Sequence, residues 1–185
     1  MTRETNTEFD ILGVNHMAIV CKDMAKTVAF YRDVLGMPLI KTIDLPAGMG
    51  QHFFFGIGNG DAIAFFWFPN APQAHPGIAA PAHLPGHGSI TSAHGSLNHI
   101  AFNIPADKFD AYVERLVEKG VQISRVMNHD NSPAQISATM NKDVFLRSVY
   151  FFDPDGVCLE FACWTRELNA QDVSYETSAS AHAPS

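Results

Sequence analysis

Two stretches of the chain carry the same succession of hydrophobic and polar positions. The hexamer Asn-His-Met-Ala-Ile-Val at 15–20 recurs as Asn-His-Ile-Ala-Phe-Asn at 98–103, a shift of 98 − 15 = 83 residues. Each hexamer leads into apolar residues at helical spacing, from Asp23 to Gly36 and from Asp107 to Gly120. Asp is a good helix N-cap and Gly commonly follows a helix C-terminus. The pattern therefore predicts a strand and then a helix in each copy.

The second halves of the two copies also correspond. Each contains a pair of β-rich runs around a turn, with Gly58–Asp61 in the first copy and Asp153–Gly156 in the second. A further strand is expected in each copy, near 39–43 and near 121–126. Each copy is thus predicted to be a βαβββ module.

The fold class expected is α+β, with two tandem βαβββ modules forming one curved, partly closed mixed β-sheet. The helices would lie outside this sheet. Expected boundaries are a flexible N-terminus at 1–9, a first module at 10–68, a Pro/Gly/His-rich linker or lid at 69–97, a second module at 98–168 and a flexible tail at 169–185.

Composition narrows the class of protein. Hydrophobic residues make up 46% and charged residues 17%, so the chain can bury a real core. The net charge of −7 argues against nucleic-acid and membrane-surface binding. No apolar run reaches the roughly 18 residues that span a bilayer, and no signal peptide is recognised. Three cysteines in apolar surroundings favour free thiols, so a cytoplasmic location is expected.

Strand alternation brings three ligand-type side chains to one face. Side chains alternate across a strand, so His16 and His99 point away from the apolar set that packs under the helices. On the last strand Glu160 is likewise opposite the apolar set. A single His or Glu at such a position is more often a core residue whose polar atoms are hydrogen-bonded. A buried carboxylate without a partner is costly, however. Two equivalent His residues and a Glu therefore predict a shared metal ion in the concave face of the sheet.

The repeat also indicates how many protein ligands this metal has. Aligning the two turn glycines places Ala64 opposite Glu160, and alanine cannot bind a metal. Three protein ligands with open positions suit non-haem Fe(II) working on O₂, while Mn(II) and Zn(II) remain possible.

These residues resemble the vicinal oxygen chelate superfamily, which includes glyoxalase I, fosfomycin- and bleomycin-resistance proteins and type I extradiol dioxygenases. The paired modules, the two Asn-His strands and the Asp-Pro-Asp-Gly turn leading to Glu160 carry the resemblance, over about residues 10–167. The match is nearest to the extradiol dioxygenases. It implies iron held by His16, His99 and Glu160, with Tyr150 contacting the catecholate or oxygen intermediates. The dioxygenase signature begins with a His where this chain has Asn141-Lys142-Asp143.

The function expected is Fe(II)-dependent ring cleavage of a catechol-like aromatic diol with O₂. Alternatives are a metal-dependent lyase, isomerase or transferase of glyoxalase or fosfomycin-resistance type, and a metal-free protein that binds an aromatic compound. His52 and His129 are further acid/base candidates, although each could be an ordinary polar residue. By analogy with the superfamily, a homodimer or higher homo-oligomer is expected.

Overall fold

The computed structural model describes residues 13–169 and 172, and the flexible ends expected at 1–9 and 169–185 lie almost entirely outside that range. Its strands form two mixed sheets, which confirms the α+β class. The first sheet has the order β1-β4-β3-β2 and the second the order β5-β9-β8-β6-β7. In each sheet the first strand of the module lies at an edge and runs parallel to the last strand, while the other pairs are antiparallel.

The first sheet and its helix come from one continuous segment. Its strands and helical segments are β1 His16–Cys21, α1 Met24–Val28, the π-helix η1 Ala29–Val34, β2 Leu39–Asp44, the 3₁₀ turn η2 Pro46–Gly48, β3 Gln51–Gly58 and β4 Asp61–Trp67.

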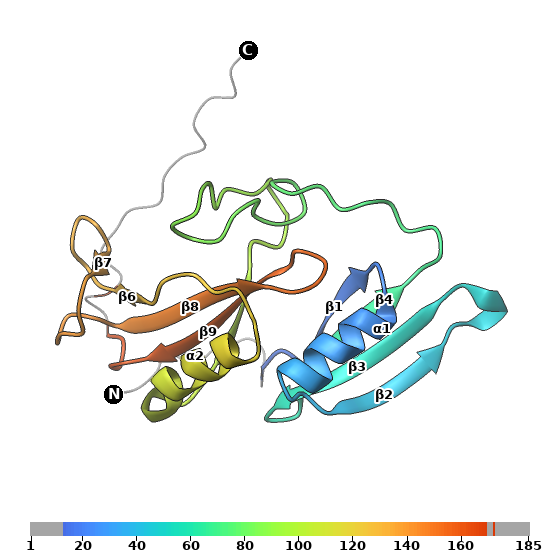
Figure 1. The fold of residues 1–185 in the computed structure, drawn as a ribbon, viewed down its shortest axis with the longest axis horizontal. Coiled ribbons are helices and arrows are strands. Elements are labelled where there is room, and N and C mark those ends of the chain that lie inside the picture. The colour runs from blue at the N-terminus through green and yellow to red at the C-terminus, as the bar shows by residue number, and fades with distance from the viewer. Residues whose placement is uncertain (1–12, 170–171, 173–185) are drawn as a thin grey trace, which may run out of the picture.

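The second sheet is built in the same order. Its segments are β5 Ile100–Asn103, the 3₁₀ turn η3 Ala106–Lys108, α2 Phe109–Glu118, β6 Met127–His129, β7 Ile136–Ser137, β8 Leu146–Phe152 and β9 Cys158–Trp164. Figure 1 shows the two sheets side by side, with α1 and α2 toward the viewer and segment 68–99 crossing from β4 to β5. Because the described strands fall into two hydrogen-bonded sheets, joining them into a single curved sheet would need an additional pairing.

Local signals account for several of these boundaries. The Asp23 carboxylate accepts a hydrogen bond from the Lys26 backbone N–H at 3.1 Å, as expected of an N-cap. Gly36 and Gly120 end their helices with φ of 74° and 77°, which non-glycine residues rarely adopt. One strand is displaced: the run expected near 121–126 forms a single bridge, Ile123 to Phe151, and the strand itself begins at Met127.

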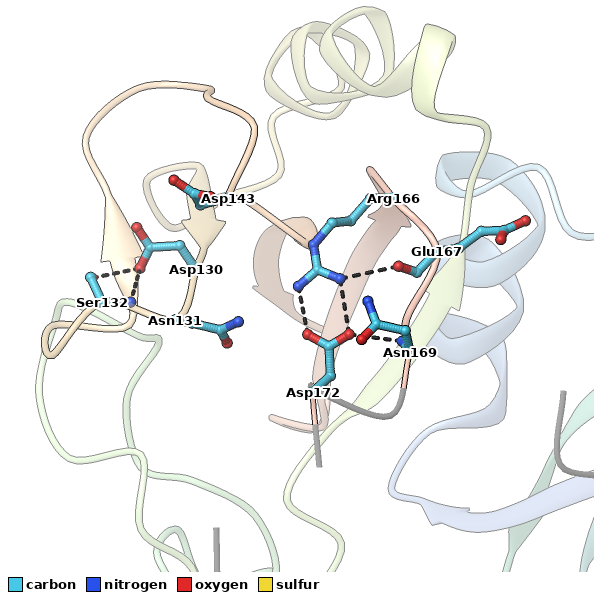
Figure 2. Close-up of a pocket in the computed structure, with 8 residues that line it drawn as sticks. All are labelled: Asp130, Asn131, Ser132, Asp143, Arg166, Glu167, Asn169 and Asp172. Atoms are coloured by element: carbon cyan, nitrogen blue, oxygen red, sulfur yellow. Dashed lines mark hydrogen bonds and ion pairs between the residues drawn. The ribbon is translucent and has the colours of Figure 1, made fainter. Parts of the chain in front are cut away.

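A polar pocket lies where the loops after β6 and β9 meet, shown in Figure 2. It encloses about 490 Å³. The Arg166 guanidinium makes two hydrogen bonds to the Asp172 carboxylate, at 2.6 and 3.0 Å, so its charge is paired within the pocket. None of the site residues expected from the sequence lines this pocket.

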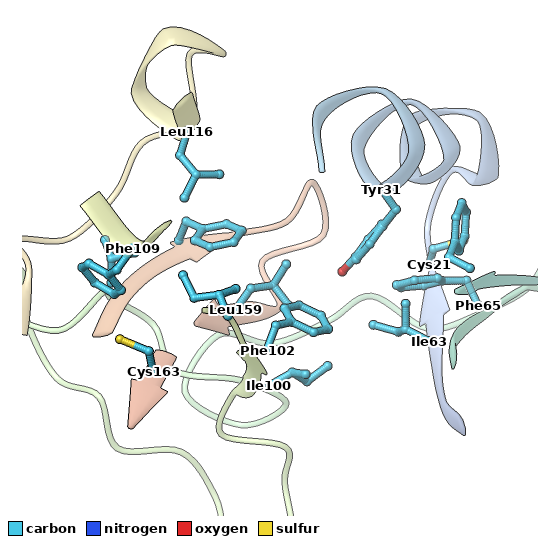
Figure 3. Packing of buried hydrophobic residues seen from close by; sticks show 14 of the residues in the cluster. Cys21, Tyr31, Ile63, Phe65, Ile100, Phe102, Phe109, Leu116, Leu159 and Cys163 are labelled. Carbon is cyan, nitrogen blue, oxygen red and sulfur yellow. The ribbon is translucent and has the colours of Figure 1, made fainter. Parts of the chain in front are cut away.

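One hydrophobic core joins the two modules on their helix side. Side chains of the first module, among them Tyr31 and Phe65, belong to the same buried cluster as Phe151 and Leu159 of the second (Figure 3). The buried Tyr31 hydroxyl donates a hydrogen bond to Asp153 Oδ2 at 3.1 Å. The modules are therefore fixed relative to one another by apolar packing and a buried polar contact.

Candidate metal site

The sheet face turned away from the helices, called the open face below, carries every sequence-predicted site residue. On the first sheet the strand register aligns His16 with Ala62, and His52 with Phe66. On the second sheet it aligns Tyr150 with Glu160 and Ala101 with Glu160. Ala18 pairs with Ala64 as Ala101 pairs with Glu160, so the alignment of the two repeats holds in space.

His99 and Glu160 lie together on the second sheet. His99 Nε2 is 3.2 Å from Glu160 Oε2, and Glu160 is 3% exposed. Glu160 Oε1 is buried and has no hydrogen-bond partner. An unpartnered buried carboxylate oxygen is costly, which indicates that this atom serves a ligand.

The geometry of this pair suits a divalent cation. Two ligand atoms about 2.1 Å from one ion, at angles between roughly 90° and 110°, lie about 3.0–3.4 Å apart. The separation of 3.2 Å between Nε2 and Oε2 falls in this range. Burial acts to raise the pKa of Glu160, but the hydrogen bond that its Oε2 shares with His99 holds the pKa below its usual value. The carboxylate is therefore charged and available as a ligand at neutral pH.

The repeated Asn-His pair has a physical purpose. His99 Nδ1 lies 2.8 Å from the side-chain oxygen of Asn98, and His16 Nδ1 lies 2.8 Å from that of Asn15. An amide oxygen can only accept, so each Nδ1 carries the proton. Nε2 is then the nitrogen that each ring offers to a metal ion, and at His99 a bound ion would take the place of the proton that Nε2 shares with Glu160 Oε2.

Within one chain, His16 does not lie next to the His99–Glu160 pair. Among residues 13–169 and 172, no three His, Cys, Asp or Glu side chains converge as a metal-binding group. His16 is exposed on β1, an edge strand of the first sheet, and its ring makes an edge contact with Phe54 at 5.5 Å between centroids. One chain thus presents two ligands together and the third on the other sheet.

Tyr150 lies beside the His99–Glu160 pair. Its ring is 5.7 Å from that of His99, and burial raises its pKa to about 12. The hydroxyl therefore stays protonated at neutral pH and can donate a hydrogen bond to a substrate oxygen.

His129 is half-buried, and its Nε2 is 2.8 Å from the hydroxyl of Ser148. Burial lowers the pKa of His129, so the ring is neutral at pH 7. Ser148, fully buried two residues before Tyr150, was missed by sequence reasoning. Its even spacing from Tyr150 on a predicted strand is the signal that could have identified it.

His52 lies on the first sheet, at the position equivalent to Ser148 on the second. It is 8% exposed and stacks on Phe66 with ring centroids 3.6 Å apart. Its Nδ1 is 3.2 Å from the Phe65 carbonyl, which can only accept, so Nε2 carries the lone pair. His52 is consequently a buried residue whose ring is held in a fixed orientation.

Comparison with known proteins identifies the family. The model of the Glyoxalase/Bleomycin resistance protein/Dioxygenase superfamily matches residues 13–161. The chain belongs to this superfamily. Its members include metal-dependent enzymes of glyoxalase, dioxygenase and fosfomycin-resistance type.

Two kinds of curated relative stand out. The chain is 25% identical over 158 residues to the fosfomycin resistance protein FosX of Listeria monocytogenes, covering 85% of this chain and 93% of FosX. It is 26% identical to the metallothiol transferase FosB of Lysinibacillus sphaericus, covering 82% of each. It is 27% identical over 115 residues to MhqE of Bacillus subtilis, named as a candidate ring-cleaving dioxygenase. That match covers 60% of this chain but only 33% of MhqE.

Solved structures support the fold. A glyoxalase/dioxygenase from Nostoc punctiforme superposes with a TM-score of 0.58 at 21% identity, over 90% of this chain and all of the other. FosX from Listeria monocytogenes, in complex with Mn(II) and sulfate, gives a TM-score of 0.53 at 22% identity, over 84% of this chain and 94% of FosX. Superfamily members bind divalent metal ions, as this complex illustrates. Among the described residues, no helix is both long and apolar enough to cross a membrane.

Proposed function

We propose that this protein is a metal-dependent enzyme whose ion is held by His16, His99 and Glu160. The buried, unpartnered Glu160 Oε1 beside the His99–Glu160 pair is the observation that carries the proposal. Two imidazole nitrogens and a carboxylate are the ligand set of non-haem Fe(II) enzymes, and Mn(II) and Zn(II) also accept such ligands.

His16 would come from a second copy of the chain. The shared core and the Tyr31–Asp153 contact fix the two modules, so His16 cannot approach Glu160 of its own chain without breaking buried packing. The edge strands β1 and β5 each pair with a single neighbour among the described strands. Such edges favour association with another chain. A homodimer would then hold two equivalent sites, each with ligands from both copies.

The substrate we propose is a small, flat, apolar molecule with two vicinal oxygens, such as a catechol. The open face of the first sheet carries stacked rings, with His52 between Phe54 and Phe66 at 4.3 and 3.6 Å. The described strands contain only two Lys or Arg residues. Arg147 pairs with Asp110 on α2, which leaves Lys41 as the one Lys or Arg side chain of the described strands that shares a face with Phe54. A face so poor in cations favours an aromatic diol over a phosphonate.

The reaction we propose is oxygen-dependent ring cleavage. Bound Fe(II) would supply Lewis-acid acidification of a substrate hydroxyl and redox chemistry with O₂. Tyr150 donates a hydrogen bond to a substrate oxygen, as its raised pKa keeps it protonated. His129 orients the Ser148 hydroxyl through their 2.8 Å contact. His52, with its free Nε2, can accept a proton from the part of the substrate that rests on the first sheet.

A second candidate is transferase or epoxide-opening chemistry of the FosB or FosX kind. The specific observation in its favour is coverage, since the chain spans 93% of FosX but about a third of MhqE. The two candidates differ in whether O₂ is consumed, which makes them separable.

The test is metal content followed by oxygen uptake. Protein made without a His tag would be analysed by mass spectrometry for bound metal, loaded anaerobically with Fe(II), and assayed with a panel of catechols. Stoichiometric iron with catechol-dependent oxygen consumption supports ring cleavage. Manganese or zinc without oxygen uptake, together with thiol or water addition to an epoxide, supports the second candidate. Absence of metal after reconstitution contradicts both.

A further inference from the structure

The segment between the modules places one leucine in a buried position. Leu84 is 5% exposed, whereas Ile78 and Ile90 of the same segment are 61% and 51% exposed. Segment 69–99 otherwise has little regular structure beyond the bridge between Pro76 and Ala80. Leu84, together with the nearby Pro81, is therefore buried, while the isoleucines on either side face solvent.

Leu84 packs on the open face of the second sheet. It forms a small cluster with Met127, Tyr150 and Cys158, separate from the main core. Tyr150 pairs directly with Glu160, and Cys158 precedes Glu160 by two residues on the same face. Leu84 thus covers the part of the sheet next to the candidate metal ligand, and it does so without belonging to the packing that joins the modules.

A tight turn holds Leu84 in place. The His87 backbone N–H donates to the Leu84 carbonyl at 2.9 Å, with Pro85 and Gly86 between them and φ of 85° at Gly86. Proline followed by a residue with positive φ is the sequence of a type II turn. A Cβ at Gly88 would lie 2.5 Å from the His83 ring, so this position also requires glycine. The sequence therefore specifies how Leu84 is presented.

We propose that Leu84 forms a roof over Tyr150, next to Glu160, and limits the size of the molecule that reaches these two residues. The identity of that molecule as an aromatic diol rests on the proposed function, whereas the size limit rests on the packing of Leu84. Leu84 is accordingly a specificity-determining residue supplied by the segment between the modules.

Cys158 gives a test that does not depend on enzyme activity. It is 2% exposed beneath Leu84, and Cys163, also 2% exposed, belongs to the main core and serves as an internal control. Native protein would be treated with iodoacetamide or with bulky N-(1-pyrenyl)maleimide, and modification of each cysteine followed by peptide mass spectrometry. Leu84→Ala would be compared with wild type and with Ile78→Ala, a matched apolar truncation at an exposed site.

We expect Leu84→Ala to speed modification of Cys158 by at least tenfold more for the bulky reagent than for iodoacetamide. Ile78→Ala should change neither rate, and Cys163 should stay protected throughout. Unchanged Cys158 rates in Leu84→Ala, or equal acceleration by both reagents, would overturn the proposal. If Cys163 also becomes reactive, the variant has loosened globally, and Leu84→Val, which keeps most of the packing, must show the same size-dependent acceleration for the proposal to survive.

A binding experiment separates this proposal from the proposed function. Anaerobic Fe(II)-loaded protein would be titrated with 4-nitrocatechol, whose absorption reports binding, and then with catechol or 3-phenylcatechol as competitors. Leu84→Ala should improve the affinity for 3-phenylcatechol relative to catechol by about tenfold. An unchanged ratio contradicts the specificity role. If no catechol binds either protein while the Cys158 result holds, the aromatic-diol function is wrong and the roof is supported.

Discussion

The contact between Tyr31 and Asp153 should contribute measurably to stability, because it joins the two modules through a buried hydrogen bond. Asp153 is 6% exposed and Tyr31 is fully buried. Asp153 Oδ1 accepts from the backbone N–H groups of Asp155 and Val157, at 2.9 and 2.8 Å. In the described part of the chain, the Tyr31 hydroxyl is the donor recorded for Oδ2. Tyr31→Phe therefore leaves a buried carboxylate oxygen without its donor.

The size of the effect follows from that loss. Leaving a buried acceptor unsatisfied costs about 1–3 kcal/mol, with charged groups toward the upper end. We expect Tyr31→Phe to lower the free energy of unfolding by about 2 kcal/mol at pH 7. Urea denaturation followed by circular dichroism measures this. Tyr112→Phe is the matched control, since Tyr112 is only half-buried and its recorded contacts are made by its ring, so its effect should stay within about 0.5 kcal/mol.

The loss of stability caused by Tyr31→Phe should also depend on pH. Burial raises the pKa of Asp153, while the backbone donors and Tyr31 oppose that rise. A raised pKa in the folded state means that the ionised carboxylate destabilises the fold once the pH exceeds its pKa in the unfolded chain, about 3.9. Removing Tyr31's donor increases this cost, so the penalty should be larger at pH 7 than at pH 4. A loss below 0.5 kcal/mol at pH 7, or a penalty that grows on acidification, would refute the reasoning.

Three further variants test other parts of the account. Tyr150→Phe should retain bound metal but lose at least about a hundredfold in turnover, measured by oxygen uptake; unchanged turnover would remove Tyr150 from the mechanism. Asn98→Ala should weaken metal affinity about 10- to 100-fold in chelator competition, because the tautomer of His99 is no longer fixed, and an unchanged affinity would contradict that role. Leu84→Ala should lower the free energy of unfolding by about 2 kcal/mol in urea titration, against little change for Ile78→Ala, and equal values for the two would argue against the buried position of Leu84.

Much of the fold could be predicted because the repeat gives each strand a counterpart. The Asp23 carboxylate caps a helix, and Gly36 and Gly120 adopt a positive φ that other residues rarely adopt. These residue types therefore predict the helix ends directly. The strand expected at 121–126 was displaced by a side chain. The Ser124 hydroxyl accepts from the Tyr150 backbone N–H at 3.0 Å, replacing a carbonyl acceptor of the regular ladder, and strand pairing resumes only at Met127. A side-chain hydroxyl that accepts in place of a backbone carbonyl does not alter the pattern of hydrophobic positions. The pattern therefore could not predict this displacement.

The candidate site was predictable residue by residue but not in its assembly. Strand alternation assigned His16, His99 and Glu160 to equivalent faces, and the register supports that assignment. Which sheets face each other depends on tertiary packing between modules, chiefly around Tyr31, and alternation within a strand carries no information about it. Leu84 was missed for a related reason, since a single apolar residue in a polar connection gives no periodic signal.

Native mass spectrometry of mixed dimers tests most directly whether the metal site is shared between two copies of the chain. His16→Ala and Glu160→Gln proteins of distinguishable mass would be unfolded together, refolded and supplied with metal. We predict two ions in the wild-type dimer, none in either variant homodimer, and one in the mixed dimer, because one of its sites combines an intact His16 with an intact Glu160 from the other chain. A mixed dimer without metal, alongside a metal-loaded wild-type protein, would contradict a shared site.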